Sequence, residues 1–254
     1  MVPNESKGRV AMNRVALITG AARRVGAAIA HTLHTAGFNI VLHYRTSAEA
    51  AHALCETLEA ARPDSAITLE ADLLNLESLP ILVEQATTAW GRLDCLINNA
   101  STFYQTPLAQ ATLAQWDDLI GTNVRAPYFL SQAAAPWLRS TQGCIVNIVD
   151  IYAERPLTGH SIYGIGKAGL VMLTKALAQE LGPLVRVNAV APGIVLWPEQ
   201  PISESYKTYL LARTTLGRAG STLEVAQAVR FLVQDATYTS GHVLTVDGGR
   251  SVGH

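Results

Sequence analysis

Residues 14–37, RVALITGAARRVGAAIAHTLHTAG, contain the pattern that decides the fold. The apolar run 14–18 is typical of a short buried strand, and the apolar spacing of 24–36 is typical of a helix that ends at Gly37. The two are joined by TGAARRVG, residues 19–26, a turn rich in small residues. A strand that leads through such a turn into a helix presents the N–H groups of the helix N-terminus, which can bind an anion.

The same alternation continues along the chain. Strand-like runs follow at 40–44, 66–71, 93–100, 143–150, 185–192 and 242–246, and helix-like runs lie at 48–61, 76–90, 161–181 and 223–233, with two helical stretches in about 113–138. Alternation of this kind indicates βαβ units and a parallel sheet. The expected fold class is α/β, with about seven strands in one doubly wound parallel sheet and helices on both faces.

The pattern contains no linker between domains. We expect residues 1–13 to form a flexible tail and residues 14–254 to form a single domain. The longest stretch without strand character is 193–221, which contains two prolines, with a third just before it at Pro192, and a polar helix-like segment. In this architecture such a stretch is expected to act as a lid over the site.

Composition excludes several classes of function. The chain of 254 residues has 19 Lys and Arg, 20 Asp and Glu and a net charge of -1, so no broad surface for nucleic acid is expected. No apolar run approaches the roughly 18 residues that span a bilayer, and the N-terminal residues lack the apolar centre of a signal peptide. The three cysteines have no metal-ligand spacing. We expect a cytoplasmic protein without a metal, in which His31 and His34 are surface residues.

The turn after the first strand is a candidate nucleotide site. Ligands of doubly wound sheets bind at the carboxyl ends of the strands, where a pyrophosphate would lie on the helix N-terminus. The residues expected there are Thr19, Gly20, Arg23, Arg24 and Gly26. The alternative is that this segment is only a turn.

The end of the second strand favours NADPH over NADH. An NAD site would offer Asp or Glu to the ribose hydroxyls at about this distance from the glycines, but the segment is HYRTS and the first acid is Glu49. Arg45 can instead bind a 2′-phosphate, with the Thr46 and Ser47 hydroxyls beside it. The alternative is that Arg45 is a solvated loop arginine.

Tyr163 and Lys167 are candidate catalytic residues. They are four apart in the helix-like segment SIYGIGKAGL, so both project from one face. A nearby ammonium favours phenolate and is expected to lower the pKa of Tyr163, which could then exchange a proton near neutral pH. This spacing is common by chance, so it indicates a catalytic pair only when other motifs accompany it.

Several motifs accompany it in a fixed order: TGxxxxxG at 19–26, NNA at 98–100, Asn123 in GTNV, YxxxK at 163–167 and PG at 192–193. In order and spacing the chain resembles the short-chain dehydrogenase/reductase family along nearly its whole length. The resemblance implies a Rossmann-type fold, a nicotinamide cofactor and Tyr163 as proton donor. It also implies that Lys167 binds the nicotinamide ribose and tunes Tyr163, and that Asn123 holds a proton-relay water. The nucleotide site would further include His43, Tyr44, Asp72, Leu73, Asn99, Ala100, Ser101, Tyr163, Lys167, Pro192 and Gly193.

Two departures from the usual family pattern narrow the resemblance. Arg24 replaces the middle glycine of the first motif, and Asp150 stands where most members have a catalytic Ser, 13 residues before the Tyr. With NNASTFY (98–104), HYRTSAEA (43–50) and DIYAERP (150–156), these residues resemble the pteridine reductases and the related bacterial dihydromonapterin reductases.

That narrower resemblance implies a pterin substrate. Phe103 would stack the pterin against the nicotinamide, Ser101 would bind its polar edge and cofactor phosphate, and Arg24 would bridge phosphate and pterin. Gly193 would also contact the substrate, and the pterin nitrogen would be protonated through Asp150 and Tyr163 or through a water held by Arg24. Two simpler interpretations stay open: Phe103 as core packing and Asp150 as a strand-end cap.

The expected reaction is hydride transfer from NADPH to a pterin, giving a dihydropterin or tetrahydropterin. One alternative is a short-chain reductase of a carbonyl or quinoid compound, with Asp150 as a drifted Ser. Another is an NADP(H) sensor or interaction module without catalysis, against which the intact Tyr163, Lys167 and Asn123 argue. By family resemblance a homotetramer is expected, packed through 113–138 and 161–181.

Overall fold

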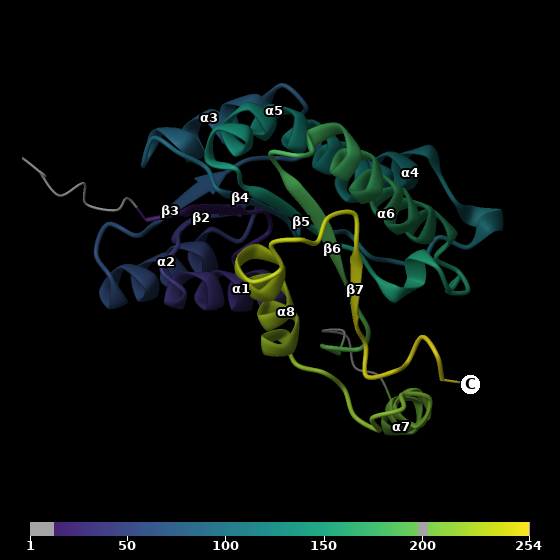
Figure 1. Cartoon of the computed structure of the whole chain (residues 1–254). Coiled ribbons are helices and arrows are strands. Elements are labelled where there is room, and N and C mark those ends of the chain that lie inside the picture. The colour runs from purple at the N-terminus through teal and green to yellow at the C-terminus, as the bar shows by residue number, and fades with distance from the viewer. Residues whose placement is uncertain (1–12, 198–202, 254) are drawn as a thin grey trace, which may run out of the picture.

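The computed structural model describes residues 13–197 and 203–253. The predicted tail, residues 1–13, therefore lies almost wholly outside the described residues. Seven parallel strands form one sheet in the order β3-β2-β1-β4-β5-β6-β7, which confirms the predicted fold class (Figure 1). Their bounds are Val15–Ile18 (β1), Asn39–Tyr44 (β2), Ala66–Glu70 (β3), Cys95–Asn98 (β4), Cys144–Ile148 (β5), Arg186–Pro192 (β6) and Val243–Val246 (β7).

Helices cover both faces of the sheet. In Figure 1, α3, α4, α5 and α6 lie on one side of the sheet and α1, α2 and α8 on the other, while α7 lies apart near the C-terminal segment. Their bounds are Arg24–Thr35 (α1), Ala48–Ala61 (α2), Ser78–Thr88 (α3), Leu113–Ile120 (α4), Ala126–Thr141 (α5), Ser161–Leu181 (α6), Glu204–Ala212 (α7) and Thr222–Gln234 (α8).

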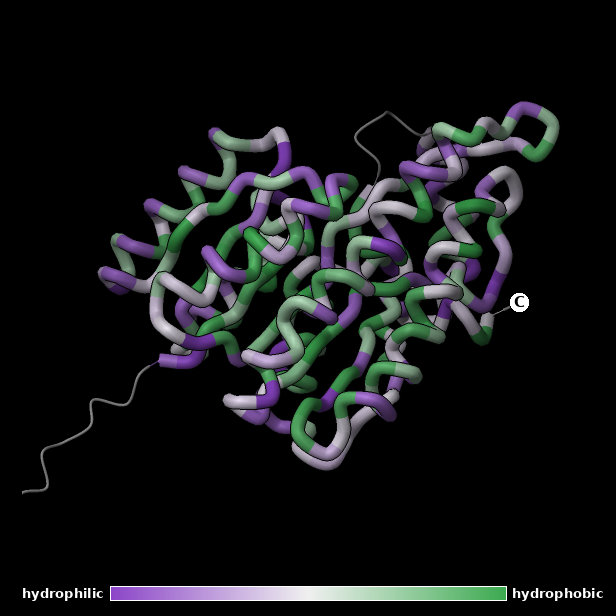
Figure 2. The backbone as a smooth tube through the Cα atoms, turned by 90° about the horizontal axis from the view of Figure 1, so that it is seen from above, coloured by the Kyte–Doolittle hydropathy of each residue, from purple (hydrophilic) through white to green (hydrophobic). Residues whose placement is uncertain are grey.

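Strand β1 shows why the central strands are apolar at every position. Val15 and Leu17 belong to the hydrophobic core under α3, α5 and α6, whereas Ala16 and Ile18 belong to the core under α1 and α8. Successive side chains of a strand point to opposite faces, and both faces of a doubly wound sheet are buried. Figure 2 shows the result, with apolar residues toward the middle of the molecule and hydrophilic residues on the outer helices.

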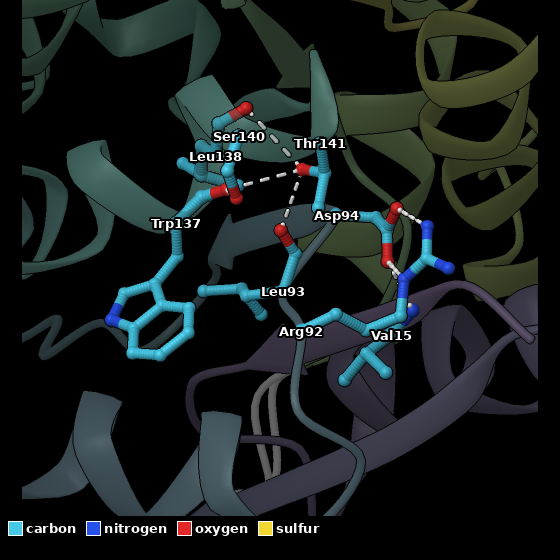
Figure 3. Close-up of polar contacts among 8 residues, drawn as sticks. All are labelled: Val15, Arg92, Leu93, Asp94, Trp137, Leu138, Ser140 and Thr141. Atoms are coloured by element: carbon cyan, nitrogen blue, oxygen red, sulfur yellow. Dashed lines mark hydrogen bonds and ion pairs between the residues drawn. The ribbon is translucent and has the colours of Figure 1, made fainter. Parts of the chain in front are cut away.

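The sheet is anchored at the amino ends of its strands by the buried Asp94 carboxylate (Figure 3). It accepts hydrogen bonds from Val15 N (2.8 Å) and from Arg92 Nε (2.8 Å) and Nη2 (2.6 Å). The hydroxyl of Thr141 donates to Leu93 O (2.8 Å) and ties the end of α5 to the same place. These contacts fix the start of β4 beside β1.

Two sequence-based expectations differ from the structure in detail, and the helix-like segment of the predicted lid is confirmed. The helical region 113–138 is interrupted by a π-helical turn, Gly121–Arg125, that joins α4 to α5. The predicted lid, 193–221, contains α7, and part of it lies outside the described residues. His34 is not a surface residue, because it is buried with its Nε2 2.7 Å from Ser65 Oγ.

Within the described ranges, no helix has the length and hydropathy that crossing a bilayer requires.

Candidate active site

A cleft of about 1620 Å³ lies over the carboxyl ends of the strands. It brings together most of the residues that the sequence analysis singled out. Those that line it are Gly20, Arg23, Arg24, Gly26, His43, Arg45, Asp72, Leu73, Asn99, Ala100, Ser101, Phe103, Asp150, Tyr163, Lys167, Pro192 and Gly193. Five other predicted residues, Thr19, Tyr44, Thr46, Ser47 and Asn123, do not line it.

The turn after β1 packs closely against the start of α1 and leaves the N-terminus of that helix open. A Cβ atom at Gly26 would lie 2.3 Å from Gly20 O, so only glycine fits there. Gly20 has a φ of +62°, which also favours glycine. The N-terminus of α1 has no side-chain cap and no acid in its first turn. Its N–H groups and the helix dipole therefore suit a phosphate.

Arg24 holds an unusual backbone conformation at the start of this helix. Its φ is +56°, in the left-handed region where a residue with a Cβ costs free energy, on the order of 1 kcal/mol or more. This is the position where the family pattern has glycine. The side chain that replaces it lines the cleft. A strained residue of this kind is more often retained for function than for stability.

Thr19 and Asn99 support the turn. The Thr19 hydroxyl oxygen accepts hydrogen bonds from the backbone N–H groups of Asn99 (2.9 Å) and Ala100 (3.0 Å). Asn99 Nδ2 donates to Thr19 O (2.8 Å) and Gly20 O (3.0 Å). Thr19 therefore ties the ends of β1 and β4 together and does not itself face the cleft.

His43 holds the same turn from the other side. Its Nδ1 accepts a hydrogen bond from Gly20 N (3.1 Å), so Nε2 carries the proton and donates it to Ala71 O (3.1 Å). The side chain is 2% exposed. Burial lowers the pKa of His43 to about 4, partly opposed by the Ala71 carbonyl. The imidazole is thus neutral at physiological pH.

Of the residues predicted to bind the cofactor around the end of β2, some line the cleft and others do not. Arg45 and Asp72 both line the cleft, with Arg45 Nη1 4.0 Å from Asp72 Oδ1 and side chains 50% and 52% exposed. So loose a pair leaves Arg45 available to a ligand. Tyr44 is buried outside the cleft, where its hydroxyl reaches Glu70 Oε2 at 3.4 Å. Ser47 precedes α2 but makes no side-chain capping bond.

Asp150 and Tyr163 form a hydrogen-bonded pair at the end of β5. Tyr163 Oη donates to Asp150 Oδ2 at 2.7 Å, and Asp150 Oδ1 accepts from Tyr152 N at 2.9 Å. The carboxylate therefore caps the short helix Ile151–Ala153 and also binds the phenol. Burial raises the pKa of Asp150, although its hydrogen bonds and Lys167 oppose the shift. The proposed strand-end cap is thus present, together with the contact to Tyr163.

The predicted lowering of the Tyr163 pKa is wrong for the chain without ligands. Burial, followed by the negative charge of Asp150, raises the pKa of Tyr163. Lys167 Nζ donates to Ile148 O at 2.9 Å and lies 5.7 Å from the centre of the Tyr163 ring. The i to i+4 spacing placed the ammonium on the correct helix face, but a backbone carbonyl binds it. Burial lowers the pKa of Lys167 to about 8.

Asn123 lies in the π-helical turn and is fully buried. Its Nδ2 donates to Thr102 O (3.0 Å) and Leu119 O (2.9 Å), and its Oδ1 accepts from Ser101 Oγ (2.7 Å). These bonds hold the segment after β4 beside the cleft. The predicted contact with a relay water stays a prediction.

Phe103 forms an aromatic platform in the cleft. Its ring stacks on His160, with centroids 4.7 Å apart and planes at 14°, and meets Tyr163 edge-on at 4.8 Å and 78°. The side chain is 51% exposed, so the interpretation of Phe103 as core packing is wrong. His160, which stacks on Phe103, was not predicted from the sequence. Its position three residues before Tyr163, at the start of α6, was the available signal.

Part of the outer wall of the cleft lies in the predicted lid, but its individual residues were not predicted from the sequence. This wall is built from the loop after β5, the region around α7 and the segment after β7. Its members include Arg155, Trp197, Tyr206, Tyr209, Leu210, Arg213, Arg250 and Gly253. Arg155 lies in the DIYAERP segment and five of the others lie in the predicted lid, but all of these residues come together only in the folded chain.

Comparisons with known proteins agree with this geometry. A family model described as enoyl-(acyl carrier protein) reductase matches residues 20–251. Pteridine reductase 1 of Leishmania tarentolae is 38% identical, over 94% of this chain and 96% of the relative. The 3-oxoacyl-(acyl-carrier-protein) reductase FabG of Staphylococcus aureus is 33% identical, over 94% and 98%. A ketoacyl reductase of the granaticin polyketide synthase from Streptomyces violaceoruber is 38% identical, over 92% and 95%.

Proposed function

The chain belongs to the short-chain dehydrogenase/reductase family, and from this premise we propose that it is an NADPH-dependent pteridine reductase. Membership makes it an oxidoreductase that works with a nicotinamide cofactor. The finer assignment, a pterin as the substrate, rests on one observation. A carboxylate, Asp150, accepts the hydrogen bond of the Tyr163 phenol at 2.7 Å.

The substitution of a carboxyl group for the usual Ser suits a nitrogen-rich substrate. A Ser hydroxyl can hold the oxygen of a carbonyl substrate, whereas a carboxylate only accepts hydrogen bonds and would repel that oxygen. A pterin offers an amino group and ring N–H groups that donate to a carboxylate. When protonated, the same carboxyl can donate to a ring nitrogen. Asp150 therefore favours a pterin over a ketone.

The nucleotide half of the cleft fits a dinucleotide. The open N-terminus of α1, with Gly20, Arg23 and Gly26, would hold its phosphates, and Lys167 would hold the nicotinamide ribose. Arg45 would bind a 2′-phosphate, which is the reason to propose NADPH. When bound, the cofactor supplies a hydride to the substrate.

The substrate half supplies a platform, polar partners and a proton. The exposed ring of Phe103 can stack a pterin, and Ser101, Arg24 and Gly193 line the cleft around it. Asp150 and Tyr163 share the proton that a ring nitrogen takes up when the adjacent ring carbon receives the hydride. Because burial raises the pKa of the Asp150 carboxyl, its proton is retained closer to neutral pH than in water.

A second candidate is reduction of a 3-oxoacyl thioester. The likeness to the staphylococcal reductase and to the ketoacyl reductase favours it. In that case Asp150 would be a drifted Ser with no part in proton transfer.

Oxidation of NADPH with a panel of substrates tests the proposal. The panel contains dihydropterins, oxidised pterins and folates on one side and acetoacetyl-CoA and simple ketones on the other. We expect kcat/KM for at least one pterin to exceed that for every carbonyl compound. Turnover of carbonyl compounds without pterins would select the second candidate.

We also propose self-association into a homotetramer through the face of α4, α5 and α6. Large apolar side chains are exposed there: Leu113, Trp116, Tyr128, Trp137, Ile165 and Met172. An exposed apolar face of this extent is typical of an interface between protein chains. Light scattering at micromolar concentration tests this, and a monomer would contradict it. Cytoplasmic location stays a prediction from the sequence.

A further inference from the structure

Three arginines gather at the outer end of the cleft, away from the predicted nucleotide half. Arg155 follows β5, Arg213 follows α7, and Arg250 follows β7. All three line the same cleft. In the sheet order, β5, β6 and β7 lie on one side of β4, whereas the turns with Arg23, Arg24 and Arg45 follow β1 and β2 on the other. The outer cluster is thus a separate group of charges.

The three guanidinium groups are positioned by neutral acceptors. Arg155 Nη1 donates to Arg250 O (2.5 Å), and Arg250 Nη1 donates to Leu210 O (2.8 Å). Arg213 donates to the Tyr209 hydroxyl, and its Cζ lies 4.9 Å from the centre of the Tyr209 ring. Each group keeps further N–H donors beyond these bonds.

The segment after β7 is folded back so that Arg250 reaches this place. The carboxylate of Asp247 accepts from Gly249 N (2.9 Å) and Ser251 N (2.6 Å), and Leu216 N donates to Gly248 O (2.9 Å). This hydrogen-bonded turn therefore holds Arg250 beside the end of α7.

No carboxylate of the described residues forms an ion pair with the three arginines. The described acids that line the cleft are Asp72, beside Arg45, and Asp150, beside Tyr163. Nearby, Glu204 is paired with Lys207 at 2.6 Å. The described residues that line the outer end of the cleft therefore carry three cations and no acid, and contribute a positive potential there. Such a potential attracts anionic ligands.

An aromatic wall lies on the same side of the cleft. Trp197, Tyr206 and Tyr209 line it, and the two tyrosine rings stack with centroids 6.3 Å apart and planes at 17°. A ligand that reaches the arginines can pass along this wall. The wall suits an apolar or aromatic linker, and the arginines suit the charge at its end.

We propose that Arg155, Arg213 and Arg250 form an anion subsite for an acidic group at the far end of the substrate's side chain. The identity of the reduced ring rests on the proposed function, but the anion subsite does not. Carboxylate and phosphate groups can both accept two charge-assisted hydrogen bonds from one guanidinium group. The extended wall between ring and charge favours a carboxylate on an aryl-containing tail over a charge attached directly to the ring.

Binding without turnover tests the subsite independently of the reaction. N-(4-aminobenzoyl)-L-glutamate and phenyl phosphate are titrated into the complex of the protein with NADP⁺ by calorimetry. We expect one of them to bind, and Arg213→Gln and Arg250→Gln to weaken it by about tenfold to a hundredfold, the effect of losing a charged hydrogen-bond partner. Arg230→Gln, an exposed arginine on α8, is the matched control and should change nothing. Binding of neither probe, or equal loss in the control, would overturn the proposal.

Kinetics link the subsite to the substrate. With dihydrofolate, Arg213→Gln should raise KM about tenfold or more with kcat nearly unchanged. With dihydrobiopterin, whose side chain is neutral, the same variant should keep the KM of the unmodified protein. Equal effects on both substrates would contradict the subsite. Arg213 is exposed, and among the described residues its side chain has a hydrogen bond only to the Tyr209 hydroxyl, so Arg213→Gln should fold even if Arg250→Gln does not.

The two proposals fail in different ways. Arginine-dependent binding of a probe without turnover of any pterin would overturn the pteridine reductase assignment and leave the subsite standing. If pterins are turned over but the arginine variants do not change the discrimination between neutral and acidic tails, the subsite is overturned and the pteridine reductase assignment stands.

Discussion

Tyr163 Oη lies 2.7 Å from Asp150 Oδ2, and this hydrogen bond joins the start of α6 to the end of β5 at the centre of the cleft. The phenol and the carboxyl titrate as a pair. Burial raises the pKa of Asp150, and burial with the Asp150 charge raises that of Tyr163. The pair therefore holds its protons to higher pH than either group would in water.

A pH profile of the reaction follows from these shifts. The protonated pair is the form that donates, so kcat/KM for a dihydropterin should be high on the acidic side and fall as pH rises through the pKa of the pair. In Asp150→Asn this descending limb should disappear or move. A profile that is identical in the variant would remove Asp150 from the proton path.

Tyr163→Phe tests the phenol. The variant keeps the ring that meets Phe103 edge-on but loses the transferable proton. We expect NADPH binding close to that of the unmodified protein and pterin turnover lower by a factor on the order of 10² to 10⁴. Fluorescence titration and initial rates measure the two quantities. Turnover near the original rate would assign the acid to another group.

Arg45→Ala tests the choice of cofactor. Arg45 is half exposed and only loosely paired with Asp72, so it is available to a 2′-phosphate. We expect the unmodified protein to prefer NADPH in kcat/KM and the variant to lose most of that preference, because a charged partner of the phosphate is removed. Equal efficiency with NADH and NADPH in the unmodified protein would contradict the assignment.

The buried His43 should make the fold sensitive to acid. Its pKa is about 4 in the folded protein against 6.5 for the ordinary group, so below pH 6.5 the unfolded chain takes up a proton that the folded one refuses. Stability is therefore lost as pH falls from about 6.5 toward 4, by about 2 to 3 kcal/mol for this group.

His43→Asn should remove that part of the pH dependence, although it also weakens the turn at Gly20. Urea unfolding at pH 7.5 and pH 4.5 gives the free energy of unfolding of both proteins. The difference between the two pH values should be smaller in the variant. An equal difference would show that other groups cause the acid sensitivity.

Most of the fold was predictable because strands and helices have different spacings of apolar residues in the sequence. The buried run of β1 and the spacing in α1 indicate one βα unit, and the repeats of that unit indicate a parallel sheet. The π-helical turn at Gly121–Arg125, which joins the two predicted helical stretches, was not predictable from the spacing of apolar residues. Only the hydrogen-bond pattern separates this turn from α4 and α5.

Motifs predicted only part of the lining of the cleft, because Thr19 and Asn123 belong to motifs but do not line it. Glycine spacing, the Tyr163 and Lys167 pair and the position of Asp150 all placed residues in the cleft correctly. The direction of the Tyr163 pKa was missed because sequence spacing does not reveal how deeply the phenol is buried, and burial together with the Asp150 charge raises its pKa. The outer arginines were missed because they converge from three distant segments without a shared motif.

The measurement that tests the central claim most directly is dihydropterin reduction by Asp150→Ser, with NADPH and with a thermal melt as the control for folding. If the carboxyl works with Tyr163 on a pterin, kcat/KM should fall by a factor on the order of 10² to 10⁴ while the melting temperature changes little. If Asp150 only caps Ile151–Ala153, pterin reduction should remain near the original rate, and activity toward acetoacetyl-CoA should match or exceed it. The first result is the one this account predicts, and the second would contradict it.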